Sequence, residues 1–115
     1  MSDTSRSLAV NYYEAMARKD LATVSSYLDQ NVQFVGPMAQ ATGKEPVLEL
    51  TRRFFTMITG LTIHKSFGDD TQAVIVYDVE CPAPIGTARA AVLVTFADKL
   101  ITKFELFYDS KRYQS

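Results

Sequence analysis

The period of the hydrophobic pattern changes for the rest of the chain at Thr59-Gly60. Before this point apolar residues recur every three or four positions, which is typical of amphipathic helices. After it they alternate, and turn residues at Gly68-Asp-Asp70 and Ala97-Asp-Lys99 divide the rest into strands. Because connections this short favour antiparallel neighbours, the pattern predicts helices followed by an antiparallel sheet, which is an α+β fold.

Three helices are expected before the change in period, over about residues 4–19, 20–28 and 42–58. Asp20 has the character of an N-cap, so the first two helices are expected to form a hairpin with a sharp corner. Thr42 stands three residues before a glutamate, which is the spacing of a capping box at the start of the third helix.

A short strand over 32–35 is expected between a turn at 29–31 and a loop at 38–42. Four longer strands should follow the third helix, over about residues 61–67, 72–81, 87–97 and 100–109. A strongly curved, mainly antiparallel sheet with three helices on its concave face forms a cone-shaped barrel, with a cavity at its open end. The strand over 87–97 is apolar on both parities and should be buried on both faces. In a small chain this predicts a homodimer through the outer sheet face.

Composition narrows the function classes. The 115 residues suit one domain spanning 1–115, and a net charge of -1 without a basic stripe argues against nucleic acid. With Cys81 as the single cysteine and His64 as the single histidine, we expect no disulfide framework, metal site or cofactor. The polar N-terminus and the short apolar runs predict a cytoplasmic protein that does not enter a membrane.

Five stretches in a characteristic order resemble a known family and together extend over nearly the whole chain. They are residues 12–21 (YYEAMARKDL), 32–37 (VQFVGP), 42–45 (TGKE), 76–79 (VYDV) and 107–109 (FYD). The chain thus resembles the SnoaL-like branch of the nuclear transport factor 2-like superfamily, whose members are cone-shaped α+β barrels. The superfamily includes ketosteroid isomerase, polyketide cyclases and non-enzymatic association domains, so the resemblance implies the fold and leaves the activity open.

The resemblance bears on individual positions. Gly36 and Val92 stand where ketosteroid isomerase has its acids, and only the tyrosine of its first helix finds a counterpart, in Tyr12. Steroid isomerisation is therefore not expected. In SnoaL-like cyclases an aspartate at the end of the last strand acts as acid and base, and Asp109 matches it. The resemblance implies cofactor-independent acid/base chemistry with Asp109 as proton carrier and Tyr12 or Tyr77 as hydrogen-bond donor.

Strand alternation qualifies the role of Asp109. It places Phe104, Leu106 and Tyr108 towards the cavity, and Asp109 with Ile101 on the opposite face. A bulge at the strand end would redirect the carboxylate into the cavity. Without one, Asp109 simply ends the strand.

The remaining polar candidates have less specific patterns. Asp78 lies on the outward parity and would face the last strand's aspartate across the cavity only if its own strand were flipped. His64 reads as a surface or interface residue, and Cys81 has no evident base. Arg52 and Arg53 are expected on a solvated helix face, since an anion-binding role would need the cavity mouth nearby.

Aromatic and apolar side chains are expected to form a cavity wall that holds a small hydrophobic or aromatic molecule. The predicted wall consists of Tyr12, Phe34, Met38, Phe54, Tyr77, Phe104, Leu106 and Tyr108. Two functions stay open. One is isomerase, cyclase or hydratase chemistry, and the other is a non-catalytic ligand-binding or dimeric association module.

Overall fold

The computed structural model describes residues 4–109, and in this range it confirms an α+β fold with three helices. The elements follow in the order α1 (Thr4–Ala17), α2 (Leu21–Ser26), β1 (Leu28–Val35), β2 (Gln40–Thr42), α3 (Lys44–Met57), β3 (Gly60–Gly68), β4 (Gln72–Glu80), β5 (Thr87–Ala97) and β6 (Leu100–Tyr108).

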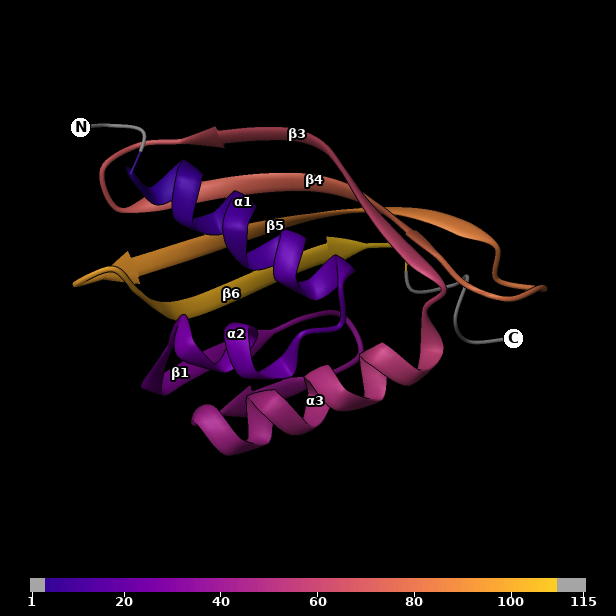
Figure 1. The fold of residues 1–115 in the computed structure, drawn as a ribbon, viewed down its shortest axis with the longest axis horizontal. Coiled ribbons are helices and arrows are strands. Elements are labelled where there is room, and N and C mark those ends of the chain that lie inside the picture. Colours follow the sequence, from indigo (N-terminus) through magenta and orange to yellow (C-terminus); the bar gives the residue numbers. More distant parts are fainter. Residues whose placement is uncertain (1–3, 110–115) are drawn as a thin grey trace.

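The strands form one curved, unclosed sheet in the order β2-β1-β6-β5-β4-β3. Strands β3 to β6 are an antiparallel meander, whereas β1 runs parallel to β6 and antiparallel to β2. Figure 1 shows α1 lying across the sheet and α3 running beside β1. Helix α1 packs on β3 and β4, and α3 packs on β1 and β2, so the helices cover one face.

The predicted cap at Asp20 is confirmed. Its carboxylate accepts hydrogen bonds from the backbone N of Thr23 at 3.2 Å and from the Thr23 hydroxyl at 2.7 Å. Before it, Lys19 takes a positive φ of 58°, which turns the chain sharply out of α1. The helix hairpin therefore has almost no loop.

The second helix ends earlier than predicted, and β1 begins earlier. Leu28 is in β1 and pairs with Ile101, and the carbonyl of Tyr27 accepts a hydrogen bond from the Ile101 backbone N at 2.8 Å. Pairing with β6 therefore overrides the helical pattern of the sequence. The predicted turn at 29–31 lies inside β1, where the register shifts and Asp29 accepts a hydrogen bond from the backbone N of Asn31 at 2.8 Å.

Two predictions before α3 were also wrong. The expected loop contains β2, which pairs with β1. Thr42 is the last residue of that strand, and Gly43 takes the N-cap position without a side-chain cap, so the capping box does not form. The φ of Gly43 is 101°, a conformation that glycine adopts at little cost. Helix α3 therefore begins at a backbone conformation that Gly43 adopts easily, and no side chain caps its N-terminus.

Strict alternation fails at the start of β6. The register with β5 shifts so that Phe96 pairs with Ile101 and Thr95 pairs with Lys103. Ile101 and Phe104 are both buried although they stand three residues apart, so the outward placement of Ile101 was wrong. The irregularity lies near the beginning of β6 and not at its end, where a bulge could redirect Asp109.

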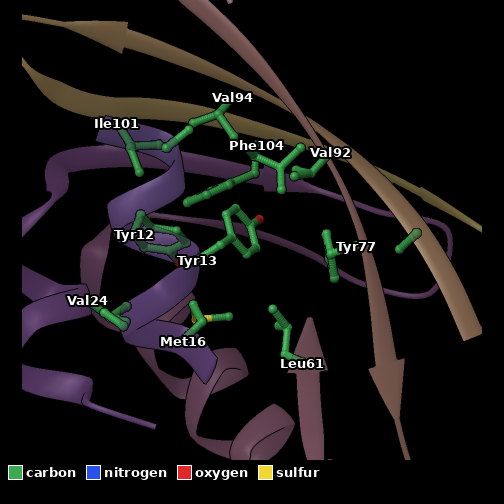
Figure 2. Close-up of a cluster of buried hydrophobic side chains, with 14 of the residues drawn as sticks. Tyr12, Tyr13, Met16, Val24, Leu61, Tyr77, Val92, Val94, Ile101 and Phe104 are labelled. Atoms are coloured by element: carbon green, nitrogen blue, oxygen red, sulfur yellow. The ribbon is translucent and has the colours of Figure 1, made fainter. Parts of the chain in front are cut away.

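The core lies between α1 and the sheet. In Figure 2, Tyr12 and Tyr13 of α1 lie near Phe104 of β6 and Tyr77 of β4. The ring centroids of Tyr12 and Phe104 are 5.3 Å apart, and those of Tyr13 and Tyr77 are 5.0 Å apart. These distances are typical of favourable aromatic pairs. An aromatic layer thus joins the first helix to the middle of the sheet.

Candidate functional site

A cavity of about 480 Å³ lies on the helix-covered face of the sheet. Its wall is drawn from α1, α3, β4, β5 and β6, from β1 and the turn that follows it, and from the loop between β4 and β5. The structure brings all eight side chains of the predicted wall together on it, namely Tyr12, Phe34, Met38, Phe54, Tyr77, Phe104, Leu106 and Tyr108.

Helix α3 contributes more of the wall than the sequence predicted. Phe54 was the only residue of this helix in the predicted wall. The lining residues Val47, Leu50, Phe54 and Met57 recur at three- and four-residue intervals, which puts them on one face of the helix. Thr51 joins them, and its hydroxyl donates to the carbonyl of Val47 at 2.9 Å. The apolar stripe of α3 was visible in the sequence and could have identified these residues.

Tyrosine hydroxyls are the main polar groups of the wall. Burial raises the pKa of Tyr12 well above its ordinary value, and the nearby Tyr77 raises it further. The pKa of Tyr13 is raised by burial, by the neighbouring tyrosines and by a side-chain hydrogen bond with Tyr77. Burial also raises the pKa of Tyr108. These phenols stay neutral near pH 7, so they can donate hydrogen bonds but are poor bases.

Asp109 follows Tyr108 directly, at the end of β6, but its side chain is exposed and it does not contribute to the cavity wall. No aspartate or glutamate lines the cavity among residues 4–109. A proton carrier must reach the reacting group within hydrogen-bond distance, directly or through one water. The observed wall therefore contains neutral hydroxyls and no carboxylate.

Asp78 lies on the opposite face of the sheet from the cavity. Tyr77 and Val79 on either side of it line the cavity, so β4 is not flipped. Arg89 Nε and Nη2 donate to the two carboxylate oxygens of Asp78 at 2.8 and 3.0 Å. These hydrogen bonds hold the pKa of Asp78 below its usual value, and the charges of Arg89 and His64 lower it further. Asp78 and Asp109 do not meet across the cavity.

His64 and Cys81 also lie off the wall. His64 is exposed, at a register shift in β3 between Ile63 and Lys65. Cys81 is buried, and burial raises the pKa of its thiol, which disfavours the reactive thiolate. In the described part of the chain, no three His, Cys, Asp or Glu side chains gather into a group that could hold a metal ion.

Three lining residues are well exposed and mark the open rim of the cavity. Met38 and Met57 are 49% and 39% exposed, and the Arg53 side chain is 75% exposed. Sequence reasoning missed the rim position of Arg53, because the pattern of α3 alone does not show what lies beside the helix. None of the described helices has the length and apolar character needed to cross a membrane.

Solved structures with this fold are numerous. A protein from Kribbella flavida DSM 17836 has a TM-score of 0.92 at 24% sequence identity, over 98% of this chain and 93% of that chain. An NTF2-like protein of unknown function from Cytophaga hutchinsonii ATCC 33406 has a TM-score of 0.83 at 20% identity, over 96% and 95% of the two chains.

A ketosteroid isomerase-like protein, also from Kribbella flavida DSM 17836, has a TM-score of 0.85 at 16% identity, over 94% of this chain and 79% of that chain. At such identities the similarity shows the fold alone. No curated protein matches the chain. The SnoaL-like domain family, in contrast, matches residues 9–104, which is most of the sequence. The chain therefore belongs to the SnoaL-like domain family, as its sequence motifs predicted.

Proposed function

We propose that this protein binds a small, flat hydrophobic molecule in the cavity between α1, α3 and the sheet. The observation that carries the proposal is the composition of the wall, in which aromatic and aliphatic side chains surround a few neutral phenols. Ligand sites are commonly cavities of roughly 300–1,000 Å³ with mostly apolar walls and a small number of polar groups. A volume of about 480 Å³ falls in this range.

The aromatic side chains favour a planar ligand. Tyr12, Tyr13 and Tyr77 line the cavity and pack against one another, with ring centroids 4.9 Å apart for Tyr12 and Tyr13 and 5.0 Å apart for Tyr13 and Tyr77. A flat molecule can stack on such rings or contact their edges. A buried polar group on the ligand needs a hydrogen-bond partner, which a phenol on the wall can supply. The site thus suits an aromatic or polycyclic body with one polar substituent.

Binding without chemistry accounts for the wall better than acid/base catalysis does, because no described carboxylate lines it. Catalysis by Asp109 stays a prediction. It is motivated by the position of this residue directly after Tyr108, a lining residue. If Asp109 is the proton carrier, the wild-type protein should accelerate deuterium exchange at the α-carbon of 2-tetralone, as measured by NMR. The D109N variant should not. Equal exchange rates with and without the wild-type protein would exclude this chemistry for that class of ketone.

The binding proposal is tested with N-phenyl-1-naphthylamine, a neutral aromatic dye whose fluorescence rises in apolar surroundings. We expect saturable binding to the wild-type protein. Leu106→Trp places an indole in part of the cavity. It should weaken dye binding by about tenfold or more, because the indole and the dye then compete for the same volume and overpacking is costly.

Leu100→Trp is the matched control, because Leu100 is the first residue of β6 and does not line the cavity. It should leave the affinity unchanged. Circular dichroism melts establish that both variants fold. Absence of dye binding to the wild-type protein, or equal affinity losses in the two variants, would contradict the proposed site.

We also propose that the outer face of the sheet pairs with a second copy of the chain. Half-buried apolar side chains lie at its centre, on β4 and β5, and Phe107 of β6 is 59% exposed. Contiguous exposed apolar surface commonly marks an interface. The same face carries the ion pairs Asp78–Arg89 and Lys103–Glu105. A surface with both signs of charge can match itself across a two-fold axis, where each contact occurs twice.

A further inference from the structure

Arg53 is the one charged residue on the cavity wall among residues 4–109. We propose that it selects ligands that carry a carboxylate at the end nearest the cavity mouth. The inference rests on the proposed ligand-binding function and specifies the chemical class of the ligand. The molecule would have a flat apolar body in the cavity and an anionic group at the rim.

The geometry of α3 separates Arg53 from its neighbour Arg52. Arg53 stands three residues after Leu50 and four residues before Met57, and both of these line the cavity. Residues three and four apart are neighbours on a helix surface, so Arg53 borders the apolar stripe. Arg52 does not line the cavity. Two consecutive arginines thus occupy different environments, although their sequence pattern treats them alike.

The guanidinium of Arg53 is only weakly engaged within the protein. Its Nε atom lies 3.6 Å from Glu49 Oε2, longer than the 2.7–2.9 Å of a strong charge-assisted hydrogen bond. The same glutamate lies 3.3 Å from Arg52 Nη1, so two arginines share one carboxylate. An exposed pair of this kind contributes little to stability. A ligand carboxylate, which can accept two parallel N–H bonds from arginine, would compete well for Arg53.

The surroundings of the rim favour an anion over a neutral group. Met38 and Met57 are the other exposed lining residues, no described acidic residue lines the wall, and the nearby carboxylate of Glu49 is already shared by Arg52 and Arg53. Because the Arg53 side chain is 75% exposed, water screens its charge, and its attraction to an anion at the rim should be modest. Deeper in the cavity the phenols of Tyr12 and Tyr13 are neutral, so a buried charge would gain no cationic partner there. An anionic group is therefore best placed at the mouth.

The experiment compares 2-naphthoate with its methyl ester, which keep the same ring system with and without the charge. Their affinities are measured by displacement of N-phenyl-1-naphthylamine at pH 7.5. For the wild-type protein we expect tighter binding of the acid, with an affinity that falls as salt is added. In Arg53→Gln, naphthoate should bind about fivefold more weakly, and the ester should bind as before.

Arg52→Gln is the matched control, since it removes an adjacent charge that also pairs with Glu49 but lies off the wall. Neither ligand should change its affinity for this variant. Equal losses of naphthoate affinity in the two variants, or equal binding of acid and ester to the wild-type protein, would overturn the role of Arg53 while ligand binding stands. Failure of the dye and of both ligands to bind would overturn ligand binding itself and the role of Arg53 with it.

Discussion

The two faces of the sheet differ more in the structure than in the sequence. Strand β5 is apolar on both parities, yet Val92 and Val94 are fully buried, whereas Leu93 between them is only partly covered. The helices bury one face and leave the other to solvent or to a partner. A strand that reads as buried on both sides can therefore be buried by its own chain on one side only.

The two faces of the sheet also differ in the charged side chains that they carry. The outer face carries the ion pairs Asp78–Arg89 and Lys103–Glu105, while the inner face holds neutral phenols among apolar groups. An unpaired charge inside would be costly to desolvate, whereas a paired and exposed one costs little. Strand parity thus separates the acids of β4 and β6 from the cavity. Because of this separation, the strands supply the cavity wall with neutral phenols and with no carboxylate from these acids.

The largest expected difference between the faces is in stability. Phe104 is 1% exposed and packs on Tyr12 and Phe34, so Phe104→Ala should lower the free energy of unfolding by about 3–5 kcal/mol. Phe107, on the same strand, is 59% exposed. Phe107→Ala should change the stability of the monomer by less than about 0.5 kcal/mol. Urea unfolding, followed by circular dichroism at low protein concentration, measures both.

This pair of variants is a direct test of the assigned faces, because it compares one substitution at two positions of one strand. Similar losses of stability at the two sites would mean that β6 is covered on both sides within a single chain. A small effect at Phe104 would mean that the aromatic layer between α1 and the sheet contributes little to the core.

The sequence predicted the inner face well, because a two-residue period and an apolar helix stripe are local signals. Tyr77 of β4 and Phe104, Leu106 and Tyr108 of β6 all lie on the cavity wall as alternation indicated. The prediction failed for Ile101, because a register shift depends on the partner strand and not on the sequence of β6 alone.

Long-range pairing also explains the misplaced start of β1 and the missed strand β2. Leu28 continues a helical pattern, yet it pairs with Ile101 of β6. The rim position of Arg53 could not be predicted from the sequence either, because it depends on how α3 packs against the sheet. Sequence patterns identify which face of an element is apolar, but they do not determine which other elements lie beside that face.

The last prediction concerns the association of two chains through the outer face. Its expected effect on folding is smaller, but it is the sharper test of this face. If this face pairs with a second copy, sedimentation equilibrium at micromolar concentration should give twice the 12.8 kDa mass of one chain. Leu93→Asp places a charge in the apolar centre of the face and should shift the mass to that of the monomer, because a buried unpaired charge is costly. Asn11→Asp adds the same charge at an exposed position of α1 and should leave the dimer intact. A wild-type monomer at these concentrations, or equal dissociation in both variants, would show that the outer face is not the interface, and its half-exposed apolar residues would then simply be solvated.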